Sequence, residues 1–422
     1  MIKVVFFRVI ELIESLYKKS TVVESVQAIS MQKCNRCLGT NLYKDAFGLQ
    51  HCLDCYEYGE INEEMVIYRS VRTLKDRKHI VDVDYELTDK QLLGSDFLIR
   101  CFEQKKSSFL QAVCGAGKTE MTYQVILNAL IAKQKVCFVL PRVEVLKELA
   151  KRFLKHFPNT IIATLYEGHK NYEEASLLLS TPQQLIYFYR EFDLMVVDEV
   201  DAFPYENNVF LQRLAQKSLK LSGITIYMSA TVTEEMKYLI DNQKIEYYLI
   251  PSRYHMKAMN IPKFVRIKNG KNKTRELIQY LEKNLKKKHQ CLIFVASIRE
   301  GKHLSKYLQQ LRINNNFISS QSVNKLDIIK EFRNKDYLFL ITTTVLERGV
   351  TFDDIDCYVY KADHSVFSKQ SLIQISGRVG RKSEYQSGQV VFLSEYISKN
   401  MKLAAKEILL MNRKNKDEVQ TL

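Results

Sequence analysis

The segment FLQAVCGAGKTEMTYQVILNALIA, residues 109–132, joins a short apolar run to a helical pattern through a glycine-containing turn. Within it, residues 112–119 fit the phosphate-binding loop pattern, with Ala112 in place of the usual first glycine. Such a turn presents backbone N–H groups and the start of a helix to phosphate oxygens. We therefore expect a nucleotide to be bound by Gly115, Ala116, Gly117, Lys118 and Thr119.

A pair of acidic residues supplies the second half of this predicted site. Residues 193–201 read DLMVVDEVD, so apolar residues lead to Asp198 and Glu199 at the carboxyl end of a predicted buried strand, the edge where open α/β sheets bind ligands. Lys118 would bridge the β- and γ-phosphates of ATP, while Thr119 and Asp198 would hold Mg²⁺. Glu199 would orient or deprotonate the attacking water.

From about residue 87 the chain alternates between short apolar runs and helical patterns, which is typical of buried parallel strands with crossover helices. The apolar runs are residues 109–113, 137–140, 160–165, 194–198 and 224–230, then 291–296, 338–344, 357–360 and 390–393. The sequence thus predicts two α/β domains, at 87–255 and 256–422. They follow an N-terminal tail or docking helix (1–30), a cysteine module (31–60) and a connector (61–86).

Four of the nine cysteines form two CxxC pairs, Cys34 with Cys37 and Cys52 with Cys55. Four thiolates at this spacing make a closed tetrahedral set that is typical of structural Zn²⁺, with an iron–sulfur site or free thiols as the alternatives. A closed set leaves no coordination position for catalysis. The module would bind DNA, bind a partner or simply stabilise the fold. The buried-looking Cys137, Cys291 and Cys357 read as core thiols.

The charge of the chain points to a polyanionic partner. Lys and Arg number 63 against 48 acidic residues, a net charge of +15. Nucleic acid and an anionic membrane surface are the candidate partners, and a solvated basic surface is the alternative. No run reaches the roughly 18 apolar residues of a membrane span, and no cleavage site follows the N-terminal apolar run. With an odd number of cysteines, these features predict a cytoplasmic protein.

Further motifs occur in the order found in superfamily 2 helicases. Residues 198–201 (DEVD), 229–231 (SAT), 342–352 (TTTVLERGVTF) and 377–381 (GRVGR) resemble motifs II, III, V and VI. Pro141-Arg142, Thr181-Pro182 and residues 292–300 resemble motifs Ia, Ib and IV. An ordered set of this size is specific. It implies two tandem RecA-like parallel-sheet domains, preceded here by a small four-cysteine zinc module, with ATP bound between the two domains.

The resemblance also implies roles for single residues. Arg378 or Arg381 would serve as an arginine finger, and Gln374 and Gly349 would contact the nucleotide or its neighbours. Gln91 resembles an adenine-reading glutamine, with a solvated helix residue as the alternative. The residues expected to contact nucleic acid, or to couple it to the nucleotide, are Arg142, Thr181, Pro182, Ser229, Thr231 and Arg348.

A narrower resemblance is to the ComFA family, competence ATPases implicated in DNA uptake by Gram-positive bacteria. It rests on DEVDAFP (198–204), LERGVTF (346–352) and the N-terminal CxxC pairs. It implies a single-stranded DNA translocase or helicase-like motor for the import of transforming DNA. A ComFC-like protein, the membrane uptake channel, peripheral membrane contact and a homo-oligomer are the implied associations. An RNA or DNA-repair helicase, and a nucleotide-gated adaptor with little hydrolysis, are the alternatives.

Overall fold

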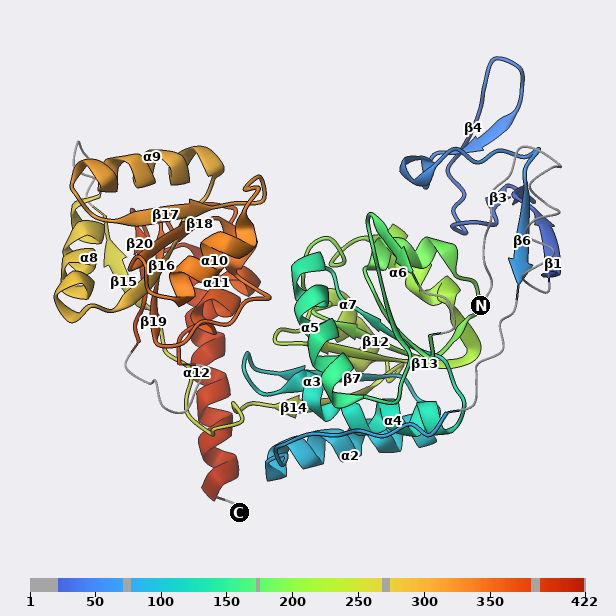
Figure 1. The fold of residues 1–422 in the computed structure, drawn as a ribbon, viewed down its shortest axis with the longest axis horizontal. Helices are drawn as coiled ribbons and strands as arrows, with labels where there is room; N and C mark the ends of the chain where they lie inside the picture. Colours follow the sequence, from blue (N-terminus) through green and yellow to red (C-terminus); the bar gives the residue numbers. More distant parts are fainter. Residues whose placement is uncertain (1–21, 71–76, 172–174, 268–273, 381–387, 421–422) are drawn as a thin grey trace. The chain divides into compact units, whose positions relative to one another are not determined.

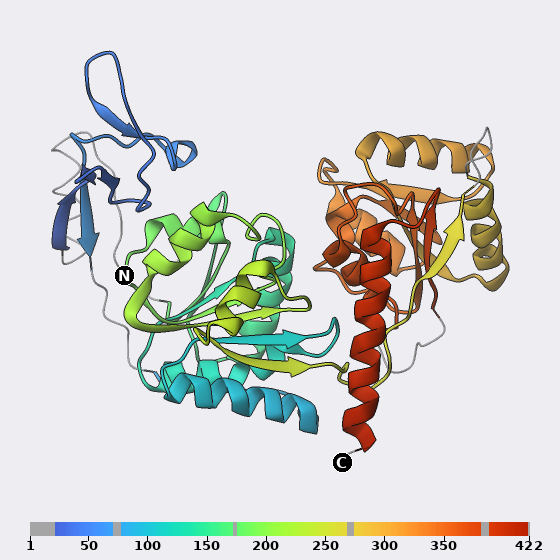
Figure 2. The same cartoon turned by 180° about the vertical axis from the view of Figure 1, so that it is seen from behind.

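The computed structural model describes residues 22–70, 77–171, 175–267, 274–380 and 388–420 (Figures 1 and 2). The chain forms two compact units. The first contains the chain up to Gln111 together with Lys118–Tyr248, and the second contains Ala112–Gly117 and Leu249–Leu422. The short segment Ala112–Gly117 therefore belongs by its contacts to the second unit, although it joins a strand and a helix of the first.

Within the described residues, the first unit is built on an eight-stranded sheet in the order β10-β9-β11-β8-β12-β13-β7-β14. Neighbouring strands from β9 to β7 are parallel, and β10 is antiparallel to β9. The predicted runs become β7 (Ser108–Ala112), β8 (Val136–Val139), β9 (Ile162–Tyr166), β12 (Phe192–Asp198) and β13 (Leu219–Ser229). The strands that the sequence reading missed are β10 (His169–Asn171), β11 (Leu177–Ser180) and β14 (Glu246–Ile250).

Helices cover both faces of this sheet, because alternate residues of each strand point to opposite sides. Figures 1 and 2 show α6 (Val209–Ser218) on one side and α2 (Asp89–Glu103) with α4 (Tyr123–Ile131) on the other. Cys137 of β8 belongs to the same apolar cluster as Leu211 and Leu214 of α6. The next residue, Phe138, packs instead on Phe153 of α5, with ring centroids 5.5 Å apart. The remaining helical segments are α3 (Lys118–Met121), α5 (Val143–His156), α7 (Glu234–Asp241) and the 3₁₀ turn η2 (Pro182–Tyr187).

The helix after the phosphate-binding turn differs from the expected one. The sequence pattern suggests a single helix from Thr119 onward, whereas the structure divides it into α3 and α4 at Thr122. The Thr122 hydroxyl and N–H both donate to the Thr119 carbonyl, at 2.7 and 3.0 Å. This local bonding replaces the regular helical pattern at a buried position, which an apolar periodicity does not reveal.

The second unit contains, in the described ranges, a six-stranded parallel sheet in the order β15-β20-β19-β16-β18-β17. The predicted runs correspond to β16 (Gln290–Phe294), β18 (Phe339–Thr342), β19 (Ile355–Tyr360) and β20 (Val390–Ser394). Two strands were missed: β15 (Lys263–Arg266) and β17 (Asn315–Ile318). The helices are α8 (Arg275–Lys287), α9 (Ile298–Gln310), α10 (Lys325–Arg333), α11 (Lys369–Ser376) and α12 (Lys399–Gln420). The prediction of two parallel α/β sheets is confirmed.

The cysteine module is a set of short antiparallel pairs. These are β1 (Val22–Gln27) with β6 (Val66–Ser70), β2 (Ile29–Ser30) with β3 (Lys33–Cys34), and β4 (Leu42–Lys44) with β5 (Gln50–Cys52). The turn η1 (Tyr56–Tyr58) follows. Residues 22–30 of the predicted tail or docking helix form β1 and β2, and residues 1–21 lie outside the described residues. The sequence pattern also did not predict β6, because it is a short run whose pairing partner lies far along the chain.

Three cysteines outside this module, Cys137, Cys291 and Cys357, are buried thiols in sheet strands, as expected for core cysteines. In the part of the chain that the structure describes, no helix combines the length and the apolar character that crossing a bilayer requires.

A glycine in the second unit gives a test of this packing. A Cβ at Gly388 would lie 2.5 Å from the carbonyl oxygen of Ile355 and 2.5 Å from Cγ1 of Val379. We expect Gly388→Ala to lower the free energy of unfolding by about 1–3 kcal/mol, because backbone and side chain must both move. The midpoint of urea denaturation measures this. Gln389→Ala, at the next position, is the control, and equal midpoints for the two variants would contradict the packing.

Candidate nucleotide site and zinc centre

The turn between β7 and α3 has the backbone of a phosphate-binding loop. Gly115 and Gly117 have φ values of 85° and 81°, in the left-handed region that glycine adopts without strain. The Ala116 N–H donates to the Val113 carbonyl at 3.1 Å, which closes the turn. Lys118 is the first residue of α3, and Thr119 follows it. The sequence pattern and the backbone conformation therefore agree.

The predicted acidic pair lies at the carboxyl end of β12. Asp198 is the last residue of that strand and is buried. Burial raises the pKa of the Asp198 carboxyl to about 6, and the positive charge of Lys118 opposes that rise, so the two side chains are close enough to interact. Glu199 has a φ of 53°, and its N–H donates to Oδ1 of Asp198 at 2.8 Å. A glutamate whose backbone adopts the left-handed conformation is strained, and such strain is common at functional sites.

The SAT motif connects to this acidic turn by a hydrogen bond. The Thr231 hydroxyl donates to Oδ2 of Asp201 at 2.6 Å, and both groups are buried. The Thr231 N–H donates to the Ser229 hydroxyl at 3.1 Å. The turns after β12 and β13 are thus bound to each other. The sequence reading named Ser229 and Thr231 but missed Asp201, although the DEVD run contains it.

The two predicted nucleic-acid contacts of this unit follow neighbouring strands. Arg142 comes shortly after β8 and begins α5, while Thr181 and Pro182 come directly after β11 and begin η2. Strands β8 and β11 are paired, so these residues share one edge of the sheet. Lys118, Asp198 and Thr231 follow β7, β12 and β13 at the same edge. The structure therefore brings these predicted residues together, at the edge where α/β sheets bind ligands.

Gln91 has a structural use that the sequence reading did not anticipate. Its Oε1 accepts hydrogen bonds from the Thr88 N–H at 3.0 Å and from the Thr88 hydroxyl at 3.1 Å. Together with the Thr88 side chain it forms the capping box at the start of α2. The adenine-reading role of Gln91 stays a prediction.

In the second unit, motif VI contacts the segment Ala112–Gly117. The thiol of Cys114 donates to Oε1 of Gln374 in α11 at 2.9 Å. A Cβ at Gly377 would lie 2.5 Å from Cβ of Cys114, so only glycine allows this approach. The buried Arg253 donates to the Val379 carbonyl at 2.8 Å. Sequence reasoning missed Arg253, because it stands alone in a stretch without a motif.

Arg378 contacts the backbone of motif V. Its Nε donates to the Glu347 carbonyl at 3.0 Å, and its Nη1 donates to the Val350 carbonyl. Arg348 is buried, with Nε 3.6 Å from Oε1 of Glu347, and Gly349 has a left-handed φ of 82°. In this structure Arg378 therefore supports the motif V turn. Arg381, the other predicted finger, lies outside the described residues.

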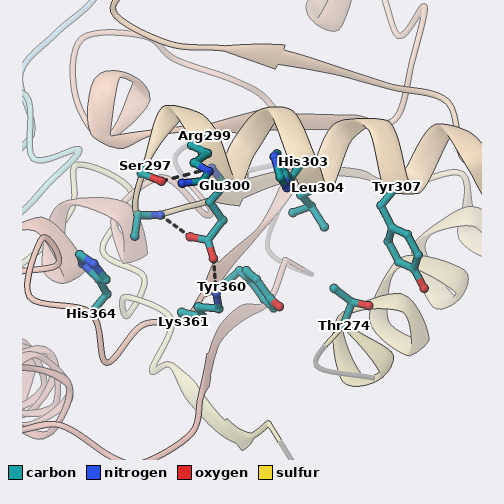
Figure 3. A pocket seen from close by; sticks show the side chains of 11 residues that line it. Thr274, Ser297, Arg299, Glu300, His303, Leu304, Tyr307, Tyr360, Lys361 and His364 are labelled. Carbon is teal, nitrogen blue, oxygen red and sulfur yellow. Dashed lines mark hydrogen bonds and ion pairs between the residues drawn. The ribbon is translucent and has the colours of Figure 1, made fainter. Parts of the chain in front are cut away.

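A cavity of about 620 Å³ opens at the carboxyl ends of β16 and β19 (Figure 3). The chain leaves β16 toward β17, and it leaves β19 toward β20 on the opposite side, so the cavity lies at a topological switch point. Glu300 accepts from the Ala296 N–H at 3.2 Å and pairs with Lys361 at 2.5 Å. Further polar side chains line the cavity: Thr274, Ser297, Arg299, His303, Tyr307, Tyr360 and His364.

The four cysteines of the N-terminal module converge on one point. Their sulfur atoms all lie within 4.8 Å of one another, and all four residues are buried. The Cys34–Cys55, Cys37–Cys52 and Cys52–Cys55 sulfur distances are 3.8, 3.6 and 3.6 Å. A tetrahedron with Zn–S bonds of about 2.3 Å has edges of about 3.8 Å. The donor set and its spacing therefore fit Zn²⁺.

Arg36, inside the first CxxC pair, compensates the charge of this thiolate set. Its side chain is only 1% exposed, and its Nη2 lies 3.0 Å from the Cys55 sulfur. The same nitrogen donates to the Cys55 carbonyl at 2.7 Å. Four thiolates and Zn²⁺ carry a net charge of −2, and a buried guanidinium reduces the cost of burying that charge. Sequence reasoning had assigned Arg36 no role at the metal.

Comparison with known proteins places the chain in a family. It is 34% identical to competence protein ComFA of Streptococcus pneumoniae over 390 residues, which covers 90% of each chain. It is 31% identical to ComFA of Bacillus subtilis over 413 residues, which covers 93% of this chain and 89% of the relative. The chain belongs to the ComFA family. The resemblance inferred from the DEVDAFP and LERGVTF motifs is thereby confirmed.

Two family descriptions match the two α/β regions. Residues 69–234 match the res subunit of type III restriction enzymes, and residues 272–383 match the helicase conserved C-terminal domain. The structure of S. cerevisiae Dbp5 bound to RNA and ADP BeF3 aligns with a TM-score of 0.57 and 16% identity, covering 77% of this chain and 92% of that one. That likeness supports the tandem RecA-like fold. This ComFA-family protein is thus a helicase-type, ATP-hydrolysing enzyme.

The zinc centre gives a direct test. We expect about one zinc per chain, because the four thiols form a complete tetrahedral set, and we expect Cys34→Ser to lose that metal. Inductively coupled plasma mass spectrometry of the purified protein measures it. Cys101→Ser, a buried cysteine outside the module, is the control and should keep the metal. Zinc retained in Cys34→Ser would contradict the ligand assignment.

Proposed function

We propose that this protein is an ATP-driven motor on single-stranded DNA that helps to import transforming DNA during natural competence. One observation supports this most directly: Lys118, Asp198 and Thr231 follow three strands of one parallel sheet and meet at its carboxyl edge. Two of these residues interact electrostatically, and the third is bonded to the acidic turn. This is the arrangement that a nucleotide-hydrolysing site requires.

The proposed chemistry uses the residues of that edge. The N–H groups of the turn and the Lys118 ammonium would bind the β- and γ-phosphates of ATP. Thr119 and Asp198 would hold Mg²⁺, which neutralises the phosphate charge. Glu199, placed by its left-handed backbone beside Asp198, would orient the attacking water. The hydrogen bond from Thr231 to Asp201 would couple a change in the conformation of the acidic turn to the end of β13.

The arginine fingers are a separate part of the proposal. Cationic donors must meet the charge that develops on the γ-phosphate in the transition state. The guanidinium of Arg378 already donates to the carbonyls of Glu347 and Val350. We therefore favour Arg381 as the finger and Arg378 as the residue that supports motif V. The proposal also includes the predicted contacts of Gln374 and Gly349 with the nucleotide or its neighbours. It includes the predicted role of Arg348 in contacting nucleic acid or coupling it to the nucleotide.

The proposed DNA path uses both units. In the first, Arg142, Thr181 and Pro182 would contact the sugar–phosphate backbone from the ends of β8 and β11. In the second, Arg299 and His303 line the cavity at the switch point of the sheet, and Arg299 supplies positive charge (Figure 3). Contacts of this kind bind the backbone without reading its sequence.

The remaining parts of the proposal concern partners and boundaries. A ComFC-like protein, the membrane uptake channel, peripheral membrane contact and self-association come from the likeness to the ComFA family. The name of the two relatives, competence protein, supports the setting in DNA import. We also propose domain boundaries at 87–255 and 256–422 for the two motor domains, whereas the pairing of β1 with β6 extends the cysteine module beyond the predicted 31–60.

The first test measures ATP hydrolysis without nucleic acid and with single-stranded DNA, duplex DNA or RNA. We expect single-stranded DNA to stimulate most. We expect Lys118→Ala to reduce the stimulated rate by about 10²-fold or more, because the γ-phosphate loses its main cation. Lys151→Ala, an exposed lysine of α5, should behave as wild type. Stronger stimulation by RNA would favour an RNA helicase, and negligible hydrolysis under all conditions would favour an adaptor.

The second test addresses the cavity of the second unit. We expect Arg299→Ala to weaken binding of single-stranded DNA by about 3- to 10-fold, since one phosphate contact is lost. We also expect the slope of the logarithm of the binding constant against the logarithm of the salt concentration to fall in magnitude by about one. Fluorescence anisotropy of a labelled oligonucleotide at several salt concentrations measures both. Lys306→Ala, an exposed lysine of the same helix that does not line the cavity, is the control. An equal loss of DNA affinity in the two variants would indicate that binding depends on the overall charge of this surface rather than on a contact made by Arg299.

A further inference from the structure

The zinc module packs on one face of α6 through three side chains. Phe210, Arg213 and Lys217 follow one another at spacings of three and four residues, so they lie on the same side of the helix. Phe210 stacks on Tyr58 of the module, with ring centroids 5.7 Å apart and planes at 23°. The other two side chains are cations, and both reach the turns that hold the metal ligands.

Arg213 binds both CxxC turns. Its Nε donates to the Cys37 carbonyl at 3.0 Å, and its Nη2 pairs with Oδ2 of Asp54 at 2.6 Å. Asp54 lies between Cys52 and Cys55 in the second CxxC pair. A Cβ at Gly39 would lie 1.9 Å from Oδ2 of Asp54 and 2.9 Å from Nη2 of Arg213, so this ion pair requires glycine there. Arg213 therefore fixes the orientation of the module on α6.

Lys217 connects the metal turn to a different element. Its Nζ donates to the Arg36 carbonyl in the first CxxC pair at 2.7 Å and to the Ile186 carbonyl in η2 at 2.8 Å. Its side chain is almost fully buried. Burial lowers the pKa of Lys217 to about 7, whereas the charges of Cys37, Cys34 and Cys55 favour its protonated form. The two hydrogen bonds of Nζ therefore join the metal turn to η2.

The turn η2 begins where nucleic acid is proposed to bind. Thr181 and Pro182 start it, and Ile186 lies near its end. The hydroxyl of Ser218, next to Lys217, donates to the Leu185 carbonyl of η2 at 3.0 Å. From the other side, the buried Arg69 of β6 lies over the ring of Tyr189, just beyond η2, at 3.6 Å from the ring centroid. The module thus reaches η2 indirectly, through Lys217 of α6, and it contacts the segment just beyond η2 directly, through Arg69.

We propose that the zinc module positions η2, through Lys217 and α6, and so sets the affinity of the motor for single-stranded DNA. The ammonium of Lys217 joins a carbonyl of the metal turn to a carbonyl of η2. Without that donor both buried carbonyls lose a hydrogen-bond partner, and the register between module and turn is lost. Lys217 is a positioning residue, since it acts through Thr181 and Pro182.

This inference rests on the proposed function, because it assumes that η2 contacts DNA. It differs from simple stabilisation of the fold in what it predicts. If the module only stabilised the fold, its disruption would lower the DNA-free and the DNA-stimulated hydrolysis rates together, because the protein would unfold. A positioning role changes the DNA concentration needed for stimulation and leaves the DNA-free hydrolysis rate unchanged.

The experiment compares Lys217→Met with wild type, using full-length protein loaded with zinc. Hydrolysis is measured against increasing concentrations of an unstructured oligonucleotide, and zinc content and thermal midpoint are measured in parallel. We expect the half-saturating concentration of single-stranded DNA to rise about 5-fold or more. We expect the DNA-free rate and the zinc content to match wild type. Lys220→Met is the matched control, since Lys220 pairs with Asp193 and not with the module.

A second perturbation covers the case in which Lys217→Met does not fold. Arg213→Gln retains the α6 helix but removes the ion pair with Asp54, and it should raise the half-saturating DNA concentration in the same direction. An unchanged value in a folded, zinc-loaded variant at either position would overturn the inference. A wild-type protein that single-stranded DNA does not stimulate would instead refute the proposed function, and the inference with it.

Discussion

In a parallel sheet, the carboxyl ends of all the strands lie at one edge. The placement of the predicted site residues in this protein depends on that constraint. In the first unit, β7, β13, β12, β8 and β11 are consecutive neighbours in the sheet. Residues far apart in the chain, such as Lys118 and Asp198, therefore interact although no local structure joins them. Burial at this edge strengthens such interactions, which is why a lysine and a carboxylate there are electrostatically linked.

In both units, buried hydrogen bonds join the predicted motifs to one another. In the first unit, the Thr231 hydroxyl bonds to Asp201 and so joins the turns after β12 and β13. In the second unit, Arg378 joins α11 to the motif V backbone, and Gln374 accepts from the thiol of Cys114. These bonds are short and buried, and each joins two motifs. Such bonds transmit a change at one motif to the next, because packed interiors do not deform continuously.

The zinc module belongs energetically to the motor rather than to a separate domain. Its four cysteines are part of the same apolar cluster as Leu185, Leu211 and Met195 of the first unit. Arg36 inside the module places a buried guanidinium against the Cys55 sulfur, and Lys217 on α6 donates to the Arg36 carbonyl. A metal bound by these cysteines would be stabilised by the domain that the module contacts, and it would in turn order that contact.

The sequence by itself determined the elements that depend on local patterns. The glycine turn before Lys118, the apolar run ending in Asp198 and the spacing of Cys34, Cys37, Cys52 and Cys55 each encode their chemistry within a few residues. The order of these patterns along the chain was sufficient to predict the two-sheet architecture and the family. The short strands β10, β11, β15 and β17 carried too little periodicity to be recognised alone.

Tertiary structure alone decided which side chains serve several elements at once. Arg253, Lys217 and Arg36 stand in the sequence as ordinary charged residues, and the bond of Asp201 with Thr231 is not visible in the DEVD motif. Their partners are backbone carbonyls and buried groups that lie tens of residues or more away, as in the contact of Lys217 with Arg36. A pattern read along the chain cannot specify such a contact, because it depends on how two separately formed elements pack.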